Sequence, residues 1–112
     1  MPRDHKLYLR DLLEASERIR EYTKNMSLSD FERSNITIDA VVRNLEVIGE
    51  AAGKLPPEIK ARSPEIEWPK IVALRNILAH EYFGVNTKIV WDVVQNKLGP
   101  INDACRNLLE GV

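Results

Sequence analysis

The chain has 112 residues, with 16 Lys and Arg against 17 Asp and Glu, and 44% of its residues are hydrophobic. These values fit one soluble domain spanning residues 1–112, and a net charge of −1 excludes a generally basic nucleic-acid coat. The single cysteine, Cys105, excludes an intrachain disulfide and suits a reducing compartment. Because no apolar run approaches the roughly 20 residues of a spanning helix, we expect a cytoplasmic protein without a membrane segment.

Two amphipathic helices are expected in the first half of the chain. Apolar residues recur at steps of three and four between residues 5 and 24, which predicts the first helix. Ser29 and Glu32 form a capping-box pattern, which predicts that a second helix begins there and continues to about Leu55. Its apolar stripe is widened by a second apolar row, so we expect this helix at the centre of the fold.

Prolines and glycines divide the second half of the chain. Pro57 predicts a short helix over residues 57–62, and Pro69 opens the next helix, which should end near residues 82–84. A last helical region over residues 88–110 should be broken or kinked at Gly99-Pro100. No segment alternates with period two, so the sequence predicts an all-α, up-and-down bundle of four or five helices.

Three polar residues gather near the end of the helix that Pro69 opens. Asn76 and His80 lie one helical turn apart on one face, and Arg75 lies beside Asn76. An imidazole exchanges protons near neutral pH, and a guanidinium binds phosphate with two parallel donors. The alternative is a histidine that contacts the last helical carbonyls, beside a solvated arginine.

A second polar group interrupts the long central helix. Arg43, Glu46 and Glu50 follow one another at steps of three and four. Two carboxylates one turn apart can indicate a metal or acid–base site. We favour a structural interpretation, in which Arg43 neutralises both carboxylates, although Arg43 could still line a cleft. The two histidines, His5 and His80, do not make a zinc site.

The polar group near the helix end belongs to a longer pattern. Residues 75–82 read Arg-x-x-x-x-His-x-Tyr with a polar residue after the arginine, and this resembles the motif of HEPN-domain ribonucleases. Residues 43–52, followed by Trp68-Pro69, narrow the resemblance to HepT-like toxins, which are encoded beside a minimal MntA-like nucleotidyltransferase antitoxin. The resemblance spans nearly the whole chain, with no departure at the motif positions.

This resemblance implies a fold, an activity and partners. It implies a HEPN-like bundle that forms a homodimer across the motif helices, and an RNA endonuclease that needs no metal or cofactor. Arg75 and His80 correspond to the catalytic pair, and Asn76 is an accessory residue. Tyr82 corresponds to the tyrosine that receives AMP from the antitoxin, and Glu81 could line the cleft or contact the antitoxin.

The chemistry of metal-free RNA cleavage agrees with a dimer. The reaction needs a base for the ribose 2′-OH, an acid for the leaving 5′-oxygen and a cation for the phosphorane. One motif offers a single histidine, His80, whereas a two-fold dimer supplies two. The expected products are a 2′,3′-cyclic phosphate and a 5′-hydroxyl. The competing hypothesis is a non-catalytic helical partner that only docks to and regulates a nucleotidyltransferase.

Overall fold

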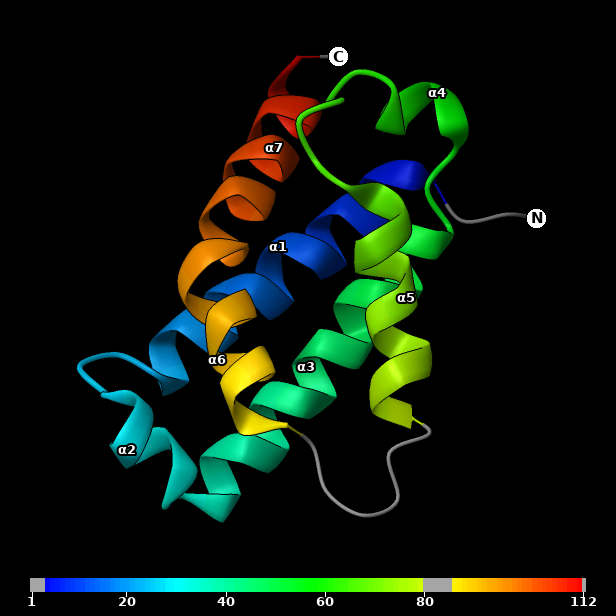
Figure 1. The fold of residues 1–112 in the computed structure, drawn as a ribbon. Coiled ribbons are helices and arrows are strands. Elements are labelled where there is room, and N and C mark those ends of the chain that lie inside the picture. The colour runs from blue at the N-terminus through cyan, green and yellow to red at the C-terminus, as the bar shows by residue number, and fades with distance from the viewer. Residues whose placement is uncertain (1–3, 80–85, 112) are drawn as a thin grey trace.

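The described part of the chain is entirely helical. A computed structural model describes residues 4–79 and 86–111, with the backbone alone for residues 75–77 and 79. These residues form seven helices and no strand (Figure 1), which confirms the all-α prediction. None of the helices within them is both long enough and apolar enough to cross a membrane.

The first helix, α1, forms as predicted and spans His5–Tyr22. Asp4 caps it, because its side chain accepts a hydrogen bond of 2.9 Å from the amide of Lys6. The helix buries one face, which includes Leu9 and Leu12. His5 is half-buried in the first turn of this helix.

The predicted capping box lies two residues earlier than expected. Helix α2 spans Leu28–Glu32, and its cap is formed by Ser27 and Asp30 rather than by Ser29 and Glu32. The Asp30 amide donates to Ser27 Oγ, and the Ser27 amide donates to Asp30 Oδ2, both at 3.1 Å. These two hydrogen bonds satisfy two amides at the helix start. The hydrogen bond from the Ser27 amide is the largest of the causes that hold the pKa of Asp30 below its usual value.

The predicted long second helix is also divided, because α2 ends at Glu32 and α3 spans Asn35–Gly53. Ser34 has an extended backbone, and its Oγ accepts a hydrogen bond of 3.3 Å from the amide of Thr37. This second cap begins a new helix, which the apolar spacing alone did not reveal.

Two helices of the second half begin close to the prolines that were predicted to open them. Helix α4 spans Pro57–Lys60 and α5 spans Trp68–Ala79, so both begin where the prolines indicated. The predicted end of α5 near residues 82–84 lies outside the described residues.

The last region breaks two residues before the predicted position. Helix α6 spans Thr87–Asn96 and α7 spans Leu98–Glu110, so the break falls at Lys97. Pro100 lies in the first turn of α7, where its missing N–H costs no helical hydrogen bond.

Two helices form the centre of the bundle. Helix α1 packs against α3 and α7, and α3 also packs against α5 (Figure 1), which confirms the central place predicted for the long helix. Leu12 of α1 and Ile48 of α3 are fully buried. Burying each such side chain contributes about 1.5–3 kcal/mol. Cys105 is also fully buried, and burial raises the pKa of its thiol to about 12.

Candidate functional site

Helix α5 is anchored at its N-terminal end by Trp68. The indole is 6% exposed, and its Nε1 donates hydrogen bonds of 3.1 Å to the carbonyl oxygens of Lys60 and Ser63. A buried indole N–H needs such an acceptor, and two acceptors fix the position of the ring. The chain around α4 therefore holds the start of α5 in place.

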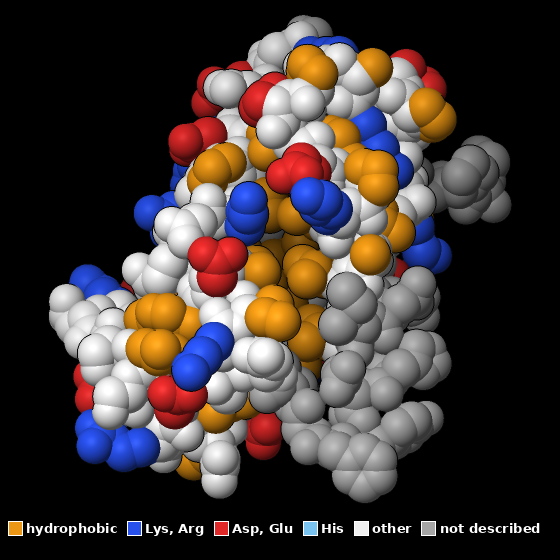
Figure 2. Space-filling model, viewed as in Figure 1, with side chains coloured by type: hydrophobic (Ala, Val, Ile, Leu, Met, Phe, Trp, Pro, Cys, Tyr) orange, Lys and Arg blue, Asp and Glu red, His pale blue; other side chains and the backbone are white. Residues whose placement is uncertain are grey.

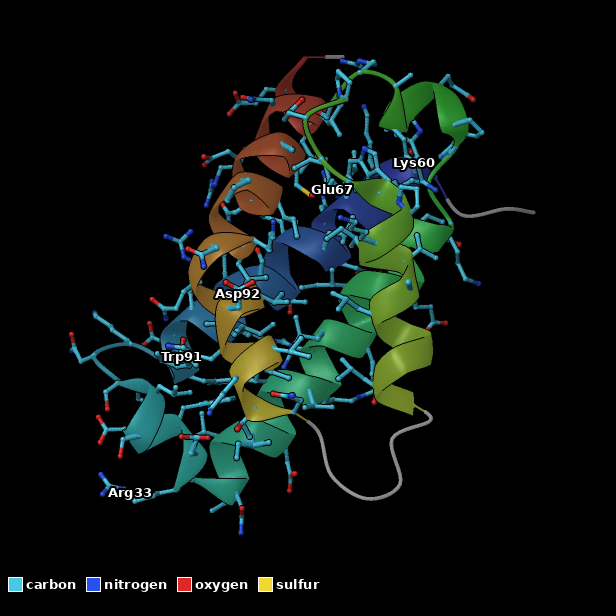
Figure 3. All side chains as sticks on the ribbon, in the orientation of Figure 1. Arg33, Lys60, Glu67, Trp91 and Asp92 are labelled. Carbon is cyan, nitrogen blue, oxygen red and sulfur yellow. The ribbon has the colours of Figure 1, made fainter. Side chains whose placement is uncertain are left out.

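An ion pair lies beside this anchor, at the surface. Lys70 Nζ lies 2.7 Å from Glu67 Oε2, and Lys97 Nζ of the α6–α7 junction lies 4.0 Å from Glu67 Oε1. The hydrogen bond and the charge of Lys70 lower the pKa of Glu67, and those of Glu67 raise the pKa of Lys70. Figure 3 shows Glu67 at the start of α5.

The middle of α5 packs closely against the end of α3. A Cβ atom at Gly53 would lie 3.6 Å from Cγ1 of Val72, so the two helices touch at these residues. The two helices run in opposite overall directions (Figure 1). Residues that precede Gly53 in α3 therefore face residues that follow Val72 in α5. Ile71 and Leu78 add buried apolar contacts along α5.

The predicted catalytic motif begins in the C-terminal half of α5. The backbone of Arg75 and Asn76 is helical there, so the two residues are neighbours on one helix as predicted. His80, Glu81 and Tyr82 lie outside the described residues. The convergence of His80 with Arg75 and Asn76 therefore stays a prediction.

The chain that follows the motif is anchored at the start of α6. Asn86 caps this helix, because its Oδ1 accepts hydrogen bonds of 3.0 Å from the amide of Lys88 and 3.2 Å from the amide of Ile89. Thr87 Oγ1 donates a hydrogen bond of 2.8 Å to Glu32 Oε2. The rings of Trp91 and Phe31 lie 5.2 Å apart, and Figure 3 shows Trp91 beside α2. Helix α2 thus holds the first turns of α6 in place.

The polar row of α3 is only partly paired. Arg43 Nη1 lies 3.9 Å from Glu46 Oε2, whereas Arg43 forms no ion pair with Glu50, so the predicted neutralisation of both carboxylates is half right. The Arg43 side chain is 74% exposed and the Glu46 side chain 30% exposed. Glu46 is therefore the more buried partner of the pair. Its ion pair with the exposed Arg43 side chain is long and should contribute little to stability.

Several hollows open on the described surface. A pocket of about 270 Å³ lies between α1 and α3, and a groove of about 250 Å³ lies between α5 and the α6–α7 pair. Figure 2 shows the hydrophobic floor of the groove, which includes Leu74 and Ile101. Within residues 4–79 and 86–111, no group of three or more His, Cys, Asp or Glu residues is arranged to hold a metal ion.

Comparison with known proteins decides the family. The family model described as "Ribonuclease HepT-like" matches residues 12–108 of the chain. The chain belongs to this family. Membership confirms the resemblance that residues 43–52 and 75–82 carried, and it agrees with the all-helical fold. No solved structure matches the chain.

Relatives of this HepT-like protein come from archaea and bacteria. The "Probable ribonuclease HepT" of Thermococcus cleftensis is 41% identical over 98 residues, which cover 88% of this chain and 89% of the relative. The "Putative RNase TTE0752" of Caldanaerobacter subterraneus is 34% identical over 92% of both chains. The "Gamma-glutamylcyclotransferase and putative RNase MJ0434" of Methanocaldococcus jannaschii is 37% identical over 98% of this chain, which spans half of that relative's length.

Proposed function

We propose that this HepT-like protein is a metal-independent RNA endonuclease and the toxin of a toxin–antitoxin pair. The observation that carries the proposal is the Arg75–Asn76 pair in the last turns of α5, followed in sequence by His80, in a chain of the HepT-like ribonuclease family. A guanidinium, an amide and an imidazole supply the cation and the proton-transfer group that RNA cleavage needs.

The proposed reaction is an attack within the RNA strand. The ribose 2′-oxygen bonds to the adjacent phosphorus while the bond from phosphorus to the 5′-oxygen breaks. One His80 takes the 2′-OH proton, and the His80 of a second copy protonates the leaving 5′-oxygen. Arg75 stabilises the charge on the phosphorane oxygens, with Asn76 as an accessory hydrogen-bonding group. The products are a 2′,3′-cyclic phosphate and a 5′-hydroxyl end.

Because each copy carries one motif histidine, the proposal includes a homodimer with both motifs at one cleft. A symmetric pair of identical sites supplies the base and the acid from the same residue type. Arg43, exposed on α3, is a candidate contact for the RNA backbone at this cleft, and Glu81 is a second candidate for the cleft wall.

The proposal also includes control by a nucleotidyltransferase antitoxin of the MntA-like type. Tyr82 is the proposed acceptor of AMP. The modification adds a bulky, negatively charged group two residues after His80, where an RNA phosphate would bind. Steric overlap and charge repulsion would both oppose RNA binding. Cleavage by protein carrying AMP on Tyr82 should therefore be far slower than cleavage by unmodified protein.

The test is an RNA cleavage assay with purified full-length protein and total RNA in the presence of a chelator. We expect cleavage to 2′,3′-cyclic phosphate and 5′-hydroxyl ends, and a loss of at least about 100-fold in rate for His80→Ala. His5→Ala is the matched control, because His5 is the other histidine of the chain. A requirement for Mg²⁺ with 5′-phosphate ends would refute the mechanism. Equal rates for His80→Ala and wild type would favour the non-catalytic partner of a nucleotidyltransferase.

A further inference from the structure

A hollow of about 290 Å³, the α1–α6 hollow, lies where the end of α1, the turn that follows it and the end of α6 meet. Two cations line it, because Arg20 of α1 and Lys24 of the following turn are four residues apart and both border the space. The amide side chains of Asn25 and Gln95 line it as well, and none of its lining residues is a carboxylate. The hollow therefore gathers positive charge and hydrogen-bond donors.

The α1–α6 hollow has a packed floor and an exposed rim. At the floor, Thr23 and Val94 are each 6% exposed and Met26 is half-buried. Thr23 Oγ1 donates a hydrogen bond of 2.9 Å to the carbonyl oxygen of Ile19. The rim residues are Arg20, Lys24, Asn25 and Gln95, and all four are exposed. The packed floor fixes the shape of the hollow, and the rim supplies the groups that a ligand would meet.

The two cations of the rim are not neutralised within the described part of the chain. No hydrogen bond or ion pair there involves the side chain of Arg20 or Lys24. Glu17, three residues before Arg20, instead lies 3.4 Å from Arg106 of α7. Glu21, the acidic residue between the two cations, pairs with neither. Two like charges so close in the chain repel each other, and a bound anion would relieve this repulsion.

A phosphodiester matches the groups of the rim. It carries one negative charge and oxygen atoms that accept hydrogen bonds. A guanidinium binds such a group with two parallel donors, an ammonium binds it as a point charge, and side-chain amides supply further donors. The hollow is larger than a phosphate group, so it also has room for part of the adjoining sugar. These contacts recognise a nucleic-acid backbone and read no base.

We propose that the α1–α6 hollow binds a backbone phosphate of the RNA substrate at a distance from the cleavage motif. Figure 1 shows α2 and the end of α1 on one side of the bundle, and α5, whose C-terminal half carries Arg75, on the other. A strand bound at the motif therefore reaches the hollow only if it extends well beyond the scissile bond. The inference rests on the proposed function, because that function makes RNA the anion that this chain meets.

The experiment measures binding of the full chain to a fluorescently labelled 2′-O-methyl oligonucleotide of about 16 nucleotides, by fluorescence anisotropy. This strand carries the phosphates but lacks the attacking 2′-OH, so binding is measured without cleavage. The hollow variant, which combines Arg20→Gln and Lys24→Gln, should bind about tenfold more weakly at low salt. The dependence of log Kd on log salt concentration should become shallower by about 1.4, because each phosphate contact with a single strand contributes about 0.7.

The matched control combines Arg10→Gln and Lys54→Gln. It removes the same charge from two exposed side chains outside the hollow, so it should change the salt dependence far less. Equal weakening in the control would indicate a general effect of net charge and overturn the proposal.

Three further results would also overturn it. One is a wild-type protein that does not bind the strand. Another is unchanged binding by the hollow variant together with a lower melting temperature, which would show that the two cations only stabilise the end of α1. The third is unchanged RNA binding together with loss of binding to the proposed antitoxin, which would assign the two cations to a protein partner.

A cleavage assay separates the hollow from the reaction. The hollow variant should raise KM for a long RNA about tenfold, because the contact holds the strand equally before and during the reaction. The difference from the wild type should vanish on a dinucleotide, which is too short to reach both places. Wild-type protein that binds the strand but cleaves no RNA would refute the proposed function and leave the binding site standing. Active wild-type protein with an unchanged KM in the hollow variant would refute the binding site alone.

Discussion

The two ends of α5 are built differently. At its start, the Trp68 indole is buried and donates two hydrogen bonds to the preceding chain, and the Glu67–Lys70 pair lies beside it. At its end lie Arg75 and Asn76, and the chain continues to His80. One end therefore carries groups that bind the protein to itself. In the proposed function, the polar groups of the other end bind RNA.

Residues that stabilise the fold and residues proposed to act on RNA therefore lie at different ends of the same helix. A rigid scaffold element that presents reactive groups at one end is an effective way to hold them in a fixed geometry. Substitutions at the start of α5 should therefore change the free energy of unfolding, and substitutions at its end should change the rate of RNA cleavage. The predictions below test this separation.

The largest effect is expected for Trp68→Ala. It removes a large buried ring and leaves the carbonyl oxygens of Lys60 and Ser63 without their donor. We expect the free energy of unfolding to fall by about 3–5 kcal/mol, measured by urea denaturation. Trp68→Phe keeps one six-membered ring but loses the N–H and the rest of the indole, so it should cost less, about 1–3 kcal/mol.

The cleavage rate of Trp68→Phe provides the control for that prediction. Under conditions in which this variant is fully folded, its rate should equal that of the wild type. A large loss of rate without unfolding would show that the start of α5 also controls the reactive end, and the separation would fail.

Arg75→Ala should have the converse effect. Loss of a cation that stabilises the phosphorane is expected to lower the cleavage rate by about 100–1000-fold. The free energy of unfolding should change by less than about 0.5 kcal/mol. Arg33→Ala is a matched control, because this arginine directly follows α2 and its side chain is 74% exposed, so its loss should affect neither quantity appreciably. A strongly destabilised Arg75→Ala protein would identify the arginine as structural.

The sequence predicted the helices well because apolar periodicity is a local property. It failed at the division between α2 and α3, where the caps at Ser27 and Ser34 compete with a continuous helical pattern. Several serines and acidic residues lie close together there, and each can cap a helix. Only the packing of both helices decides which of them does so.

The helical placement of Arg75 and Asn76 was predictable for the same reason, whereas their role in a site stays a prediction. Arg75 and Asn76 are neighbours on one helix, and this follows from spacing alone. The register of α3 against α5 does not, because it depends on tertiary contacts such as that of Gly53 with Val72. The anchoring role of Trp68 was missed too, although a tryptophan directly before a helix-opening proline was a usable signal.

The smallest effect concerns the Glu67–Lys70 pair at the start of α5. The pKa of Glu67 is lowered in the folded protein by the hydrogen bond and charge of Lys70. The pair therefore stabilises the fold above the ordinary pKa of a glutamate, and this contribution is lost as the pH falls through the folded pKa. The melting temperature of Glu67→Gln should lie slightly below that of the wild type at pH 7, and the two should converge in acid.

Glu65→Gln is the comparison that makes this small effect interpretable. Glu65 is also exposed and lies two residues away, so its removal changes the net charge by the same amount. If both variants show the same pH-dependent difference, the effect comes from net charge and not from the pair. The start of α5 would then depend on Trp68 and its apolar contacts alone. The contrast between the two ends of α5 would become one between a buried indole and the polar motif that follows it.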